Sequence, residues 1–300
     1  MMATVSTATT ESAARPAISR GSSRTPWWRS VRVYIGALII LVWGLGPFYW
    51  MLVTAFRDAD YTFDNTPWFT HVTVDNFRNA FDTSRGNDFG RALTNSVIIG
   101  AATTVIALAI GMMAAYALAR ISFRGKTVVA GLILSASMFP VVVLVTPLFQ
   151  LFTNIGWIGH YQAMIIPNIS FVLPMTVYIL ASFFSELPWE LEEAARIDGA
   201  GRFQAFRLVM LPLAAPAVFT TAILAFIAAV NEYLLASLLS TDKTEPVTVA
   251  IARFSGNDPL VQPYAAIMAA GIIVTVPLVI MVLLFQRRII SGLTAGGVKS

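Results

Sequence analysis

The sequence predicts an all-α polytopic membrane protein with six transmembrane helices, and three observations support this prediction. Hydrophobic residues make up 57% of the 300-residue chain, charged residues make up 12%, and the mean hydropathy is +0.72. Apolar runs of about 20 or more residues, enough to cross a bilayer core of about 30 Å, recur along the chain. Short charged or turn-forming stretches separate these runs. This composition excludes an ordinary soluble domain.

The N-terminal part of the chain precedes the main transmembrane core. Residues 1–30 are rich in Ala, Ser and Thr and have no apolar period, which is typical of a disordered cytosolic tail. A signal peptide is the competing interpretation, but the following apolar run is too long for one, so we expect a first transmembrane helix at 31–56. The remaining domains are an extracellular loop (57–91), a five-helix transmembrane core with a charged loop at 186–205 (92–286), and a cytosolic C-terminal tail (287–300).

Five spans are expected in the core, near 92–118, 128–152, 163–184, 208–239 and 265–285. Prolines lie within or at the ends of these spans, at Pro140, Pro147, Pro167, Pro174, Pro212, Pro216 and Pro277. Proline kinks are tolerated in membranes where neighbouring helices or water satisfy the freed backbone groups, as in transport bundles.

The distribution of basic residues predicts which face of the membrane each loop occupies. Six spans place both termini on one side. The two tails with the adjoining Arg32, the turn at 120–126 and the charged loop with the adjoining Arg207 hold 14 of the 20 Lys and Arg residues. The positive-inside rule therefore predicts that both tails and the charged loop are cytoplasmic.

The first outer loop, 57–91, is too long for a simple connection, so we expect it to fold as a small cap outside the membrane. Two interpretations of this cap remain open and are equally favoured. It forms part of a docking surface for an extracellular binding protein, or it is a solvated cover over the helices.

The charged loop has the local chemistry of a short helix followed by a turn and a second helix. Pro188 suits a first helical turn, the glutamates that follow lie at the positive end of the helix dipole, and Arg196 lies in the last turn. Gly199 supplies the C-terminal stop. Leu191, Ala194 and Ala195 fall on one face at helical spacing, which predicts an apolar knob that faces away from the carboxylates.

The order of residues in this loop resembles a known motif. Glu193, Ala194 and Ala195 precede Gly199 by a fixed gap, and a second gap leads to Val209-x-Leu211-Pro212. This pattern resembles the EAA motif of permease subunits of binding-protein-dependent ABC importers, with Val209 in place of the usual Ile. The resemblance implies the type I ABC importer permease fold and assigns ATPase coupling to Glu193, Ala194, Ala195, Asp198, Gly199, Leu211 and Pro212. An ordinary amphipathic helix on the membrane surface is the alternative.

The C-terminus carries a second resemblance, to the MalG type of carbohydrate permease within this family. It implies that Gly292, Leu293, Thr294, Gly296 and Lys299 reach the interface between two ATPase subunits. Without the resemblance, this Gly-rich end has the composition of a frayed tail. In particular, the chain resembles second permease subunits of trehalose importers.

Glu232 is the only acidic residue within a predicted span, next to Asn231 and Tyr233. An intramembrane carboxylate is costly and normally faces a cavity or a partner. The interpretation that we favour places Asn231 and Glu232 on the solute path or its outer gate, and a structural hydrogen bond between helices is the alternative. The Asn-Glu-aromatic segment also resembles carbohydrate permeases of the MalG type.

Other chemistries find little support in the sequence. Cysteine is absent, so thiolate nucleophiles and thiolate metal sites are excluded. The two histidines, His71 and His160, have no partner at ligand spacing. Arg124-Gly125-Lys126-Thr127 lacks the upstream glycine of a phosphate-binding loop, since position 120 is Arg. We therefore expect no catalytic residue, no metal and no cofactor on this chain.

The resemblance implies that ATP and Mg²⁺ bind a partner ATPase and that the chain forms half of a translocation pore for a di- or oligosaccharide such as trehalose or maltose. The implied partners are a second homologous permease, two ATPase subunits, an extracellular solute-binding protein, the sugar and membrane lipid, but no nucleic acid. The expected location is the bacterial cell membrane, with both termini cytoplasmic. Two alternatives remain, a permease for another small solute such as glycerol 3-phosphate and a secondary transporter.

Overall fold

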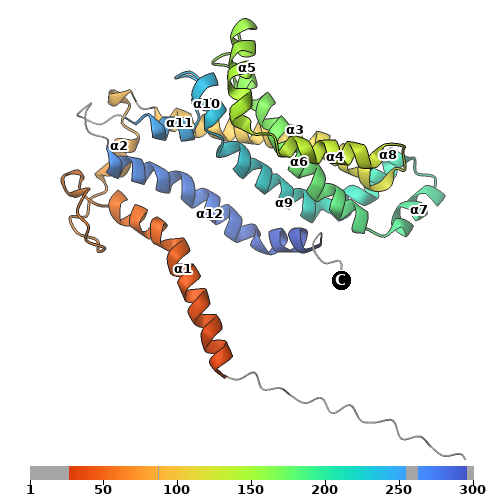
Figure 1. Ribbon diagram of the computed structural model, residues 1–300, viewed down its shortest axis with the longest axis horizontal. Coiled ribbons are helices and arrows are strands. Elements are labelled where there is room, and N and C mark those ends of the chain that lie inside the picture. Colours follow the sequence, from red (N-terminus) through yellow and green to blue (C-terminus); the bar gives the residue numbers. More distant parts are fainter. Residues whose placement is uncertain (1–26, 87, 255–262, 296–300) are drawn as a thin grey trace, which may run out of the picture. The chain divides into compact units, whose positions relative to one another are not determined.

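The computed structural model describes residues 27–86, 88–254 and 263–295, which form helices joined by short connections (Figure 1). The helices are α1 (Trp27–Ala55), α2 (Asp75–Ala80), α3 (Phe89–Arg120), α4 (Lys126–Ser137), α5 (Val141–Asn154), α6 (Tyr161–Glu186), α7 (Trp189–Ile197), α8 (Arg202–Ala205), α9 (Leu211–Val230), α10 (Leu234–Leu239), α11 (Val247–Ala252) and α12 (Tyr264–Ala295). The described residues also contain two 3₁₀ turns, η1 (Ala59–Tyr61) and η2 (Thr83–Arg85), and a π-helix, η3 (Phe206–Met210). The described residues divide into two compact units between Phe48 and Tyr49.

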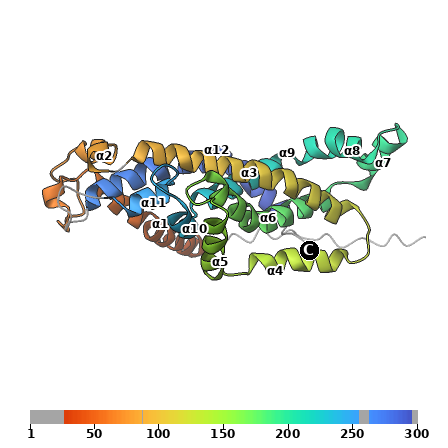
Figure 2. The ribbon, with the colours of Figure 1, turned by 90° about the horizontal axis from the view of Figure 1, so that it is seen from above.

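In the described part of the chain, five helical segments are long and apolar enough to cross a membrane, which confirms the all-helical membrane fold. They are Val31–Ala55, Phe89–Arg120, Tyr161–Glu186, Arg202–Val230 and Tyr264–Gln286. The one remaining predicted span, 128–152, is not a single helix. Its two parts, α4 and α5, meet at a bend of 86° (Figure 2). Pro140 is the N-cap of α5, and a residue that precedes proline is disfavoured in the helical conformation, so the helix breaks there. The described residues contain six spans when this bent pair counts as one.

The core of the second unit is made by α3, α6 and α9, which pack against one another. Glycines on α3 permit close approach of the backbones. A Cβ atom at Gly111 would lie 2.5 Å from the Cγ2 atom of Thr176 on α6, and one at Gly100 would lie 2.7 Å from a methyl of Val230 on α9. Small residues at helix interfaces are the usual means of tight packing in membranes, where lipid supplies no hydrophobic drive for association.

The predicted loop 57–91 is folded around the buried side chain of Arg57. Its guanidinium donates to the backbone carbonyls of Asp64, Thr66 and Trp68, and Asn76 donates to the carbonyl of Arg57 at 2.6 Å. These bonds close the segment on itself, and α2 contacts α12. The segment is therefore more than a connection, while its place outside the membrane stays a prediction.

The span predicted at 208–239 ends earlier than expected, at Val230. A three-residue break follows, and the chain then forms α10 and α11. Side chains of α3 hold the connection between α10 and α11: Asn95 donates to the carbonyls of Lys243 and Glu245, and Ser96 accepts from the amide of Val247 at 2.8 Å.

Candidate functional site

Helix α7 is the predicted coupling helix, and local sequence signals set both of its ends. Pro188 is its N-cap residue. At the other end, Gly199 adopts a left-handed conformation with φ of +91°. The amide of Gly199 donates to the carbonyl of Arg196 at 3.1 Å and the amide of Ala200 donates to that of Ala195 at 2.9 Å, which together form a Schellman motif. The glycine of the motif is thus a helix stop, as predicted.

The exposed side of α7 carries most of the predicted coupling residues. Leu191, Glu193, Ala194 and Asp198 are exposed and Ala195 is half-buried. The sequence analysis did not anticipate that Glu192 is the buried residue of this helix, with only 8% of its surface exposed.

The end of α3 explains the burial of Glu192. The hydroxyl of Tyr116 donates to Oε1 of Glu192 at 2.7 Å. One turn later, Arg120 donates to the carbonyl of Leu187 at 2.6 Å, and its guanidinium lies 4.5 Å from the ring centre of Trp189. The start of α7 is therefore fixed to α3 by polar contacts that the sequence analysis missed.

The Leu211-Pro212 part of the motif lies where the π-helix η3 becomes α9. The amide of Leu211 donates to the carbonyl of Phe206, five residues back, and not to Arg207. Pro212 has no amide hydrogen, and its ring crowds the carbonyl four residues earlier, so a wide turn relieves a conflict that a regular helix would contain. Since α7 contacts α8 and η3, the two halves of the motif are joined through this turn.

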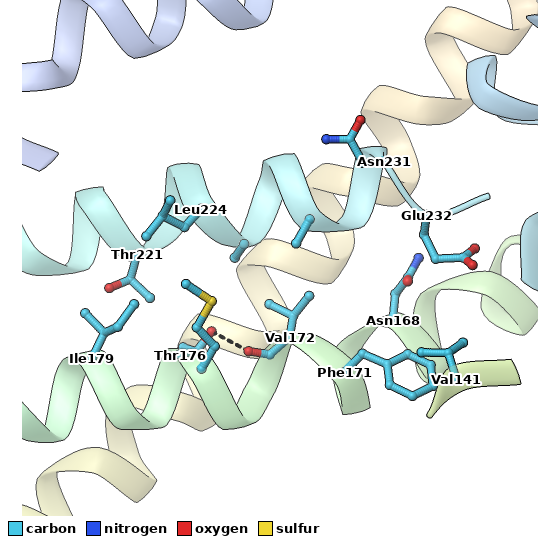
Figure 3. Close-up of a pocket in the computed structure, with 13 residues that line it drawn as sticks. Val141, Asn168, Phe171, Val172, Thr176, Ile179, Thr221, Leu224, Asn231 and Glu232 are labelled. Carbon is cyan, nitrogen blue, oxygen red and sulfur yellow. Dashed lines mark hydrogen bonds between the residues drawn. The ribbon is translucent and has the colours of Figure 1, made fainter. Parts of the chain in front are cut away.

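A second feature is a cavity of about 240 Å³ between α6 and α9 (Figure 3). Most of its wall is apolar, and its polar groups come from Asn168 and Thr176 on α6, Thr221 on α9, and Asn231 and Glu232 in the break that follows α9. The hydroxyls of Thr176 and Thr221 donate to carbonyls of their own helices at 3.0 and 2.8 Å, which leaves their oxygen lone pairs available as acceptors. The cavity therefore combines apolar surface with a few hydrogen-bonding groups.

The two residues predicted for the solute path, Asn231 and Glu232, both line this cavity, but Glu232 is not inside a helix. It caps α10: its carboxylate oxygens accept from the amides of Leu235 at 2.8 Å and Ala236 at 3.0 Å. A carboxylate at this position satisfies amides that the first helical turn leaves free. Glu232 thus has a structural bond and a place on the cavity wall, and both predicted interpretations remain open.

Asn168 is a cavity residue that the sequence analysis missed. Figure 3 shows it on α6 near Glu232, and it is buried. A search of the apolar spans for uncharged polar residues, and not only for acids, would have found it beside Pro167.

The predicted ATPase-interface residues at the C-terminus lie partly outside the described residues. Gly292, Leu293 and Thr294 belong to the last turns of α12, which extends further than the predicted span, and Gly296 and Lys299 lie outside the described residues.

Comparison with known proteins gives the family. The model of the family described as "Binding-protein-dependent transport system inner membrane component" matches residues 107–294. The chain is 43% identical to the trehalose transport system permease protein SugB of Mycobacterium tuberculosis, over 93% of this chain and 99% of that one. It is 42% identical to the trehalose/maltose transport system permease protein MalG of Thermococcus litoralis, over 90% and 97%.

A solved structure shows the same fold. It is a crystal structure of a bacterial ABC transporter involved in the import of the acidic polysaccharide alginate, and the chain matches it with a TM-score of 0.73 at 19% identity, over 88% of this chain and 98% of that one. The bent pair α4–α5, the long α3, α6 and α9, and α7 between two spans are thus parts of an ABC importer permease fold. The chain belongs to the family of inner membrane components of binding-protein-dependent transport systems, and it is a permease.

Proposed function

We propose that this permease imports a di- or oligosaccharide, with trehalose or maltose as the expected class of solute. The observation that carries this proposal is the 43% identity to a trehalose permease over nearly the whole of both chains. Other relatives point to the same chemistry, since their names refer to trehalose/maltose, sulfoquinovosyl glycerol and diacetylchitobiose. All four solutes are glycosides with many hydroxyl groups.

The cavity between α6 and α9 suits such a solute. Sugars present hydroxyls that donate and accept hydrogen bonds, and they present apolar C–H faces. Asn168, Asn231 and Glu232 supply donors or acceptors at one end of the cavity, and Thr221 supplies an acceptor further along α9. We therefore propose that Asn231 and Glu232 lie on the translocation path, with Asn168 as a third path residue.

In the proposed assembly, this chain pairs with a second homologous permease, two ATPase subunits and an extracellular solute-binding protein. ATP and Mg²⁺ bind the ATPase subunits, and this chain carries no catalytic residue. The exposed face of α7 receives the ATPase, and the C-terminal residues Gly292–Thr294, Gly296 and Lys299 reach the ATPase interface. Both termini are cytoplasmic, as the distribution of basic residues favours. Movement of α7 then opens the cavity to one side or the other.

The test is purification of the chain from its native membrane in mild detergent, with identification of every bound protein, followed by reconstitution in vesicles. We expect an ATPase and a second permease to co-purify, and we expect ATP-dependent uptake of trehalose or maltose when the binding protein is added. The sugar assignment would be contradicted if the binding protein bound neither trehalose nor maltose and the complex took up an unrelated solute. Solute transport by the isolated chain without ATP would contradict the whole proposal.

A further inference from the structure

We propose that Tyr116, Arg120 and Glu192, which we call the α3–α7 cluster, are positioning residues that pass the movement of α7 directly to α3. This inference rests on the proposed function, in which α7 receives movement from an ATPase. The EAA motif itself joins α7 to α8 and η3, which follow it in the chain. The α3–α7 cluster adds α3, which packs against both α6 and α9.

The contacts within the cluster are polar and buried. Arg120 has 7% of its surface exposed and Glu192 has 8%. Two opposite charges in one poorly hydrated region compensate each other, whereas either charge alone would be costly there. Because each charge also bonds to the other helix or to the segment next to it, α7 cannot shift along α3 without breaking a charge-assisted hydrogen bond.

The cluster also retains unused bonding capacity. Oε2 of Glu192 and both Nε and Nη1 of Arg120 are buried without a hydrogen-bond partner among the described residues. An acceptor and two donors in one cluster are complementary, so a movement of α7 that brings these atoms together would exchange the present bonds for a direct Arg120–Glu192 pair. Two alternative sets of bonds are what an element with two discrete positions requires.

Tyr116 joins the cluster to the apolar core. Its ring lies 4.8 Å from the ring of Phe206 in η3 and 6.1 Å from that of Phe184 near the end of α6. A movement of α7 therefore reaches α3 through Glu192 and reaches the aromatic packing of α6 and η3 through the same tyrosine. Tyr116 therefore connects α3 with both α6 and η3, and through η3 with the start of α9.

The experiment measures two quantities in the reconstituted complex, ATP hydrolysis and the conformational response of the cavity. The chain has no cysteine, so Met175→Cys, on the exposed wall of the cavity, gives a single site on this chain for a membrane-impermeant maleimide. In the parent chain we expect ATP with vanadate to change the labelling rate. In Tyr116→Phe, Arg120→Gln and Glu192→Gln we expect hydrolysis to continue while this change in rate falls about tenfold.

The double variant Arg120→Gln/Glu192→Gln separates positioning from simple support. Each single variant leaves one buried charge uncompensated, whereas the double variant leaves none, so it should assemble better than either single variant. It should still lack the ATP-dependent change in labelling. Matched controls are Arg124→Gln and Glu186→Gln, which remove exposed charges nearby and should behave as the parent.

The outcomes separate the two proposals. A parent complex that binds no ATPase or shows no ATP-dependent change in labelling contradicts the proposed function, and this inference with it. A responsive parent with equally responsive variants overturns the role of the α3–α7 cluster alone. Variants that lose assembly, ATP hydrolysis and labelling response in equal proportion, with the double variant no better, would make the cluster a structural support only and would also overturn the proposal.

Discussion

At the scale of single residues, one backbone angle defines the end of α7. Gly199 has a φ of +91°, and a Cβ atom added there would meet nothing within 4 Å. Substitution is therefore limited by backbone conformation and not by space. Left-handed backbone costs an L-residue with a Cβ about 1–2 kcal/mol, and the cost is lower for Asn because its short polar side chain can hydrogen-bond locally.

We expect transport to be highest with the parent Gly199 and to fall progressively in Gly199→Asn, Gly199→Ala and Gly199→Pro. Gly199→Pro should abolish uptake, because proline fixes φ near −65° and removes the amide that donates to Arg196. Glu193→Lys should also abolish uptake, because it reverses a charge on the exposed face of α7. Uptake assays at matched membrane abundance test the series, and normal uptake by well-inserted Gly199→Pro would contradict the coupling assignment.

Glu232 has two roles to separate, as helix cap and as cavity wall. Loss of a capping side chain costs about 1 kcal/mol. Glu232→Gln keeps one carbonyl oxygen for the amide of Leu235 and removes the charge, and Glu232→Ala removes both. If the carboxylate acts on the solute path, both variants should change uptake while the ATPase stays bound. Loss of assembly in the alanine variant, with normal uptake by the glutamine variant, would restrict Glu232 to the cap.

At the scale of elements, the contact between α3 and α6 depends on a missing side chain. Glycine within a helix normally costs about 0.5–1 kcal/mol relative to alanine, so a substitution should help where space permits. At Gly111 the space is filled by Thr176, whereas nothing lies within 4 Å of a Cβ atom at Gly131 on α4.

Gly111→Ala should therefore lower the melting temperature of the complex, since overpacking costs about 1–3 kcal/mol, and Gly131→Ala should leave it equal or raise it. Thr176→Ser removes the methyl group that would lie 2.5 Å from the new Cβ atom at position 111. It keeps the hydroxyl that donates to the carbonyl of Val172. The double variant Gly111→Ala/Thr176→Ser should recover most of the lost stability. Equal melting temperatures for Gly111→Ala and the parent would show that α3 and α6 separate easily.

The elements also show what the sequence can predict. Long apolar runs located the spans, and Pro188 and Gly199 located α7, because these signals are local. The break at 231–233 was missed because no proline or glycine marks it. It is held by Glu232, whose backbone carbonyl accepts from Thr248 sixteen residues later. Likewise, the burial of Glu192 depends on Tyr116, 76 residues earlier, so no local pattern could reveal it.

At the scale of the whole molecule, the distribution of charge predicts the arrangement of the chain across the membrane. Basic residues gather in the tails, the turn after α3 and the charged loop 186–205, while the segment 57–91 carries fewer for its length. By the positive-inside rule, this distribution predicts that the tails and the charged loop are cytoplasmic.

Two single-cysteine variants test the orientation. Asn65→Cys lies on the exposed part of the first outer loop, and Arg124→Cys lies in the turn between α3 and α4. A membrane-impermeant maleimide should label Asn65→Cys in intact cells, and it should label Arg124→Cys only after the membrane is opened. The reverse pattern would place the termini outside and would also remove α7 from any cytoplasmic ATPase.

The π-helix η3 has a geometric consequence for the whole permease. A π turn contains one residue more than an α turn, so the chain before it is rotated by about 100° around the helix axis relative to a regular helix. The direction in which α7 leaves α9 is thus set by a single additional residue. Deletion of Arg207 would preserve every motif residue, yet it would turn the exposed face of α7 towards a different neighbour. Spacing, and not only residue identity, is what the gap between Gly199 and Leu211 encodes.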